Sequence, residues 1–124
     1  PATDSWTPTS TVGGPSGRFD HSEVWTGSEL IVWGGAPDFP WTSPPTATGA
    51  RYSPATDSWA ATSLSGVPGA RRQHSGVWTG SEMIIWGGII ETQQGSRYCA
   101  ASLNAIFADG FESGTTSAWS AVAP

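Results

Sequence analysis

The residues best suited to chemistry in this chain are two histidines, each followed directly by a serine, at His21-Ser22 and His74-Ser75. A serine nucleophile needs a histidine base within hydrogen-bond reach, and the base needs an orienting third group. Neighbours on a strand point to opposite faces of a sheet, so neither pair can form that geometry within itself. The motif also occurs twice, whereas a catalytic group is usually unique. We therefore expect both histidines to be structural residues that pack or hydrogen-bond between strands.

The remaining polar candidates do not complete a catalytic or metal site. Glu29 and Glu82 each follow a Gly-Ser pair and are expected to flank a turn in solvent. Asp109 and Glu112 could offer oxygens to calcium, but such a site takes about 6–8 oxygen ligands and the acidic-loop pattern is absent. The single Cys99 excludes an internal disulfide and a cysteine-based zinc cluster. We expect no catalytic residue, no metal and no cofactor.

Two aromatic residues, Phe39 and Trp41, lie in the Pro-rich segment 36–46 and have no counterpart later in the sequence. Binding residues concentrate on variable loops, and an exposed aromatic ring can stack on a sugar. Phe39 and Trp41 are therefore the candidate ligand-binding residues. The simpler explanation of Trp41 is that it anchors its own loop.

An internal repeat indicates which elements must position these groups. Residues 1–35 align with residues 54–88 without a gap, and most aligned positions are identical. PATDSW at the start of the first copy returns at the start of the second, and VWTGSELIVWGG returns as VWTGSEMIIWGG. Self-similarity at a fixed period of about 20–50 residues indicates stacked or radially arranged supersecondary units.

Each repeat is predicted to form short antiparallel strands. Residues 21–26 and 29–33 are joined by Gly-Ser, a two-residue link typical of a tight hairpin in which glycine supplies a positive φ. Residues 47–53 and 58–61 supply a third and a fourth strand. We expect an all-β fold in which each four-stranded antiparallel sheet is a propeller blade.

The order of motifs resembles that of kelch repeats. Arg-x-x-His-Ser, Val-Trp-Thr-Gly, an apolar strand, Gly-Gly, Arg-Tyr and Pro-Ala-Thr-Asp-Ser-Trp follow one another within about residues 1–99. The WTGSE-M/L-I-V/I-WGG variant is similar to kelch repeats of many-bladed bacterial proteins. The resemblance implies a kelch β-propeller, with a WD40-like architecture, in which the glycine pair and the later tryptophan are framework positions. These positions are Trp6, Trp59, Gly34, Gly35, Gly87 and Gly88.

The predicted strands divide the chain into four parts. Residues 1–10 supply the outer strand of a split blade, and residues 11–62 form a complete blade. Residues 63–106 form a second blade of three strands, in which AASLNAIF replaces the expected PATDSW. Residues 107–124 are a tail rich in Gly and Ser.

About two blades cannot close a ring, because closed propellers have about 4–8 blades. Alone, they would expose apolar faces that soluble monomers rarely show. The chain could be a fragment of a longer propeller, a subunit that completes a ring with further copies, or the end of a ring whose other blades were removed. We favour a homo-oligomer, with a trimer giving six blades and a tetramer eight. Residues 1–10 would then pair with the strand around 95–99 of another copy.

Composition limits the classes of partner. The chain has five Arg, no Lys and ten carboxylates, for a net charge of −5. A nucleic-acid binder needs a basic surface, so this class is excluded. No stretch approaches the roughly 18 apolar residues of a membrane span. Few charges with abundant Thr, Ser, Trp and Gly fit a secreted bacterial protein, extracellular or periplasmic.

The favoured function is a non-enzymatic scaffold that binds protein or assembles with itself, because the repeats are nearly identical and a catalytic site would be expected to alter several loops. A purely structural form of this hypothesis is an open polymer. The alternative is a carbohydrate-binding or carbohydrate-active propeller with a site at the ring mouth, since kelch propellers include sugar oxidases and sialic acid mutarotases. The oxidases need a Tyr–Cys cross-link and separate copper ligands. Here Tyr98 and Cys99 are strand neighbours that face opposite sides.

Overall fold

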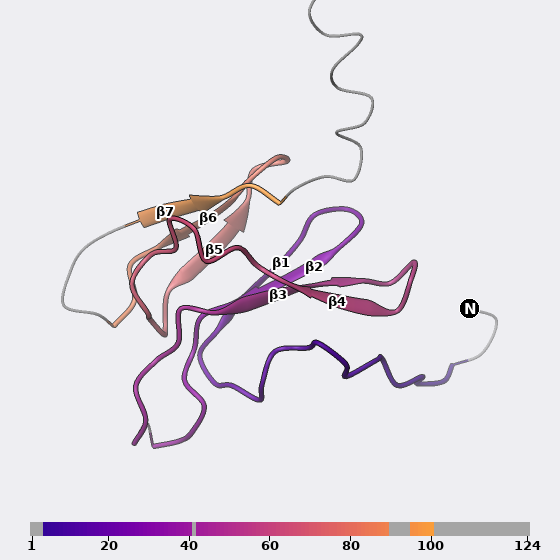
Figure 1. Ribbon diagram of the computed structural model, residues 1–124, viewed down its shortest axis with the longest axis horizontal. Helices are drawn as coiled ribbons and strands as arrows, with labels where there is room; N and C mark the ends of the chain where they lie inside the picture. Colours follow the sequence, from indigo (N-terminus) through magenta and orange to yellow (C-terminus); the bar gives the residue numbers. More distant parts are fainter. Residues whose placement is uncertain (1–3, 41, 90–94, 101–124) are drawn as a thin grey trace, which may run out of the picture.

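The computed structural model describes residues 4–40, 42–89 and 95–100 as two antiparallel sheets that do not close into a barrel (Figure 1). The first sheet contains β1 (Ser22–Trp25), β2 (Leu30–Trp33), β3 (Gly49–Ser53) and β4 (Ser58–Ala61) in that order. The second contains β5 (Ser75–Trp78), β6 (Met83–Trp86) and β7 (Gly95–Tyr98). Within these ranges no helix is present that could cross a membrane. The expected all-β class and the four antiparallel strands of the first repeat are confirmed.

The hairpins form where glycine and threonine close the turn. In the first repeat the Thr26 N–H donates to the Glu29 carbonyl at 2.9 Å, and the Thr26 hydroxyl accepts from the Glu29 N–H at 2.9 Å. Gly27 between them has a φ of 102°, a conformation that costs glycine little. The second repeat closes its hairpin in the same way, with Thr79 and Glu82.

The two sheets pack face to face, and the core lies between them. Val24 pairs with Ile31, and Trp33 lies two residues further along β2, so all three side chains share one face of the first sheet. We call it the forward face. Met83 and Ile85 of β6 lie against it, and these five residues form the buried cluster. Burying each such side chain contributes about 1.5–3 kcal/mol, which joins the two repeats into one folded unit.

The opposite, rear face of the first sheet carries Leu30, Tyr52 and Trp59, which lie side by side across β2, β3 and β4. The N-terminal segment is attached there. The Trp59 Nε1–H donates to the Ser10 carbonyl at 2.8 Å, and the Ser10 N–H donates to Asp57 Oδ1 at 2.8 Å. Figure 1 shows this segment along the first sheet, away from β5, β6 and β7.

Residues 4–18 contain no strand within the single chain. The predicted pairing of segment 1–10 involves a second chain, so it stays a prediction. The predictions for residues 1–3, Trp41, 101–106 and the tail 107–124 fall outside the described residues.

Candidate functional site

The predicted structural histidines take different places. His74 is buried between the two sheets, where its Nε2 lies 2.8 Å from the Ser22 hydroxyl. Its ring meets the edge of Trp33 with centroids 5.3 Å apart. His21 is partly exposed and lies 3.6 Å from the Glu23 carboxylate. His21 thus borders solvent, whereas His74 forms the contact with Ser22 between the two sheets, which we call the joint.

The Ser22–His74 pair has the atoms of a nucleophile and a base but not the access that catalysis requires. Both residues are buried, so a substrate cannot approach the hydroxyl. Burial lowers the pKa of His74 below its ordinary 6.5, and the positive charges of Arg71 and His21 add to this effect, while the Trp33 backbone opposes it. A neutral imidazole hydrogen-bonded to a hydroxyl is a stable way to fill a buried joint.

The aligned glycines Gly34 and Gly87 have the same backbone conformation but different surroundings. Their φ angles are 72° and 69°. A Cβ on Gly34 would lie 2.6 Å from His74 Cε1 and 3.0 Å from the Arg71 carbonyl oxygen. A Cβ on Gly87 would meet no described atom within 4 Å. The histidine of the next repeat therefore occupies the space over Gly34, and the matching space over Gly87 is open.

Gly35 and Gly88 also have positive φ angles, 90° and 94°, and both lie against backbone. A Cβ on Gly35 would lie 2.6 Å from the Phe19 carbonyl oxygen, and one on Gly88 equally close to that of Arg72. The Gly35 N–H donates to the Arg71 carbonyl at 2.8 Å, which is a second hydrogen bond between the repeats.

The side chain of Arg71 is fully buried and holds the start of the second repeat in place. Its Nη1 donates to the Gly87 carbonyl at 3.1 Å, and its Nε donates to the Gly69 carbonyl at 3.1 Å. Arg18 repeats the first of these contacts with the Gly34 carbonyl at 3.0 Å. Burial lowers the pKa of both arginines, but each still bonds as a cation to carbonyl oxygens.

The glutamates expected to stand in solvent are partly buried and paired, which corrects that expectation. Glu29 lies 3.3 Å from the Arg51 guanidinium across β2 and β3. Glu82 accepts a hydrogen bond from the Cys99 thiol at 3.1 Å and lies 3.8 Å from Arg97. The Glu82 carboxylate raises the pKa of the thiol, which makes Cys99 a weaker nucleophile. The correction follows from register, because Arg51 lies opposite Ile31, beside the glutamate.

The candidate ligand-binding residue Phe39 is 66% exposed and lies beside Phe19, with ring centroids 6.4 Å apart. The other candidate, Trp41, lies outside the described residues. Asp38 organises the loop by accepting hydrogen bonds from Thr42 and Ser43, which lower its pKa. In the described part of the chain no three His, Cys, Asp or Glu residues gather as a metal site would require.

The outward face of the second sheet is apolar and exposed. Val77, Ile84 and Trp86 expose 56%, 37% and 63% of their surface, whereas their equivalents on the forward face of the first sheet expose 8%, 0% and 5%. The difference arises because the second sheet covers this face of the first sheet, whereas no sheet among the described residues covers the matching face of the second. A contiguous exposed apolar surface of this kind marks an interaction site.

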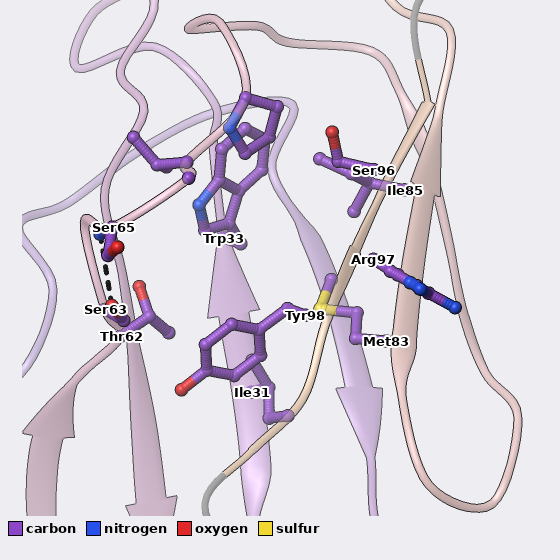
Figure 2. Close-up of a pocket in the computed structure, with 13 residues that line it drawn as sticks. Ile31, Trp33, Thr62, Ser63, Ser65, Met83, Ile85, Ser96, Arg97 and Tyr98 are labelled. Atoms are coloured by element: carbon purple, nitrogen blue, oxygen red, sulfur yellow. Dashed lines mark hydrogen bonds between the residues drawn. The ribbon is translucent and has the colours of Figure 1, made fainter.

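A pocket lies between the sheets beside β7, as Figure 2 shows. Its walls include Ile31 and Trp33 from the first sheet, Tyr98 from β7, and residues 62–63 and 65–68 of the segment that links the two sheets. The Thr62 hydroxyl is buried at its border and has no hydrogen-bond partner among the described residues. The pocket is mostly apolar with a few hydroxyl groups, so it suits an aromatic group that carries one polar atom.

Sequence reasoning missed the Ser22–His74 contact because it tested each Ser-His pair within its own repeat. The available signal was the repeat itself, since residue 22 of one unit and residue 74 of the next share one joint. Neither the known protein-family models nor the curated proteins give a match to this chain.

Proposed function

We propose that this chain is a non-enzymatic, self-assembling scaffold made of kelch-type β-propeller blades. The observation that carries the proposal is the exposed face of the second sheet with Val77, Ile84 and Trp86, which corresponds to the forward face of the first sheet. Inside the chain, the same face of the first sheet is covered by the following repeat. A second copy would cover the open face with the rear face of its own first sheet, and so continue the stack.

The joint inside the chain supplies a template for this contact. His74 sits over Gly34 and bonds to Ser22. The aligned residues are His21, Gly87 and Ser75. His21 is partly exposed, Ser75 is exposed, and the space over Gly87 is open. All the groups of a second Ser–His contact are therefore present, but His21 lies beside the first sheet and Ser75 and Gly87 lie in or beside the second.

One difference between the two repeats makes the interface between copies wider than the interface between the two sheets of one chain. Glu23 stands where the second repeat has Gly76. A Cβ on Gly76 would lie 2.9 Å from the Ser22 Cβ, so a glutamate cannot pack at that distance. The sheets of neighbouring copies must therefore lie further apart than the two sheets inside the chain, which weakens this contact relative to the internal one.

The assembly we propose is a closed ring of three or four copies with six or eight sheets, since about 4–8 blades close a propeller. An interface that fails to close would give an open filament instead. The composition fits a bacterial protein that works outside the cytoplasm, extracellular or periplasmic. Such a ring has a central mouth where a protein ligand could bind.

Sedimentation velocity of the unmodified chain and of Trp86→Ser tests the proposal. Trp86 is 63% exposed on the open face, and the matched control Phe39→Ser removes an aromatic side chain of 66% exposure from a loop. We expect the native chain and the control to self-associate, and Trp86→Ser to sediment as a monomer. Equal association of all three proteins would show that the open face is not the interface.

The exposed pair Phe19 and Phe39 favours a second candidate function, glycan binding at the loop. Two neighbouring aromatic rings offer a surface on which a sugar can stack. Titration with neutral oligosaccharides by NMR should then shift the loop resonances in the native chain and not in Phe39→Ala. The absence of shifts at millimolar sugar would rule this candidate out.

A further inference from the structure

The first sheet shows how a tryptophan of the fourth strand is held. Trp59 lies opposite Tyr52 with ring centroids 5.1 Å apart, and its Nε1–H donates to the Ser10 carbonyl. Asp57 Oδ1 accepts from the Ser10 N–H at 2.8 Å and from the Tyr52 hydroxyl at 2.7 Å. Gly13, with a φ of 75°, lies against the Trp59 backbone. Four residues thus form a seat around one indole.

Beside the second sheet, three of these four residues have counterparts, but the aspartate and the tryptophan do not. Tyr98, Ser63 and Gly66 align with Tyr52, Ser10 and Gly13. Gly66 keeps the positive φ, at 67°, yet a Cβ there would meet no described atom within 4 Å. Tyr98, Ser63 and Gly66 all line the pocket of Figure 2.

No described strand pairs with the outer edge of β7, whereas β3 in the first sheet is paired on both edges. The sequence that should fill this place is replaced after residue 99 by AASLNAIF. The matching sequence occurs instead at the other end of the chain, where PATDSW at 1–6 is identical to PATDSW at 54–59. Trp6 there is fully exposed to solvent.

We propose that residues 4–8 of one copy form the fourth strand beside β7 of a second copy. Trp6 enters the pocket between β7 and residues 62–68, and its indole N–H donates to the Ser63 carbonyl. Asp4 accepts from the Ser63 N–H and the Tyr98 hydroxyl, as Asp57 does in the first sheet. This inference rests on the self-assembly proposed above and names the segment that links the copies.

The donated strand must come from another copy because of where it starts. Ser10 is fixed to the rear face of the first sheet, whereas the second sheet packs on the forward face. The four residues from Ser10 to Trp6 span at most about 14 Å. Packed sheets are about 10 Å apart, and the segment lies one further layer behind the first sheet. Trp6 therefore cannot reach its own β7.

Two residues prevent the proposed Trp6 site beside β7 from matching the Trp59 site in every detail. Val67 stands where the first seat has Gly14, whose Cβ would lie only 3.3 Å from Trp59 Nε1. Val67 packs on the core cluster, so the indole must tilt slightly away from it. Pro8 falls opposite Ser96 and has no N–H to donate. Proline is tolerated on an outer strand, and the paired stretch ends there.

The first experiment measures the self-association constant and the amide hydrogen exchange of β7 in the full chain, in Trp6→Ala and in Val12→Ala. Val12 is an exposed apolar residue of the same N-terminal segment, outside the proposed strand, and so it is the matched control. We expect Trp6→Ala to weaken self-association by about tenfold or more and to remove the protection of the β7 amides. Val12→Ala should leave both unchanged.

Two other outcomes separate this inference from the proposed function. If the chain associates and Trp6→Ala changes neither the constant nor the protection of β7, strand donation is wrong and self-association by the open face stands. If the native chain is a monomer at every concentration, both are wrong.

A peptide experiment tests the seat itself. A labelled peptide of residues 1–10 should bind saturably to full-length Trp6→Ala, in which no second copy can place a Trp6 in the pocket, as measured by fluorescence anisotropy. The same peptide with alanine in place of Trp6 is the control, and we expect no binding. Tyr98→Phe in the acceptor should weaken binding severalfold because it removes the hydroxyl that Asp4 accepts from. Equal binding of the two peptides would overturn the inference.

Discussion

Replacing Gly34 with alanine tests the joint between the two repeats, because the same replacement at Gly87 provides a control with the same backbone. Both residues have a φ close to 70°. Only Gly34 has a neighbour in the space that the new methyl group would enter, since His74 Cε1 lies 2.6 Å from the ideal Cβ position. The difference between the two variants therefore isolates the packing contribution.

The expected magnitudes follow from two separate costs. An alanine at positive φ costs about 1–2 kcal/mol, and both variants carry this cost. Overfilling a packed site costs about 1–3 kcal/mol more. The methyl group at position 34 would also displace His74 and strain its hydrogen bond to Ser22. We expect Gly34→Ala to destabilise the chain by about 2–5 kcal/mol and Gly87→Ala by about 1–2 kcal/mol.

Urea unfolding followed by tryptophan fluorescence measures both values. The measurement is made at a protein concentration low enough to keep each variant monomeric, so that assembly does not enter the comparison. Gly34→Ala should unfold at a clearly lower urea concentration than Gly87→Ala. Equal free energies of unfolding would refute the reasoning, since they would mean that His74 does not occupy the space over Gly34.

Two further predictions concern the same joint. The free energy of unfolding should fall as the pH drops from 7 through 6.5, because the unfolded chain binds a proton at His74 that the folded chain, with its lowered pKa, does not. The decrease in stability should disappear in His74→Gln and remain in His21→Gln. The urea midpoint of each variant, measured over this pH range, tests the prediction. The same pH dependence in both variants would contradict the assignment of the effect to His74. Trp33→Ala should lower the free energy of unfolding by about 3–5 kcal/mol because the Trp33 side chain is buried. Trp25 is half-exposed, so Trp25→Ala should lower it much less. Equal losses of stability in thermal melts would contradict the core described above.

The strands of the first sheet could be predicted from the sequence because their signals are local. The Gly-Ser link, the alternation of residues 21–26 and the continuous apolar run of residues 30–33 predict a hairpin without information from distant residues. The positive φ of Gly27 and Gly80 follows from the same turn chemistry. The predicted range 21–26 contains the observed strand and extends beyond it by one residue at each end, and the range 29–33 begins one residue before its strand.

The contacts between repeats could not be predicted in the same way, because they depend on how one sheet lies on the next. Ser22 meets His74 through stacking, and no spacing within a single repeat contains that information. Trp6 and Trp59 each end an identical PATDSW segment, yet Trp6 is fully exposed and Trp59 is partly buried. Their difference arises from neighbours, because Ser10 and Tyr52 surround only Trp59.

The mass of the unmodified chain in solution tests the central claim of self-assembly most directly. Light scattering behind a sizing column, over a range of loading concentrations, gives this mass without reference to shape. A chain of 12.9 kDa that completes its own ring should give three or four times that value. A mass of one chain at every concentration would contradict the account, because no second copy would then cover the exposed face of the second sheet or place Trp6 in the pocket beside β7.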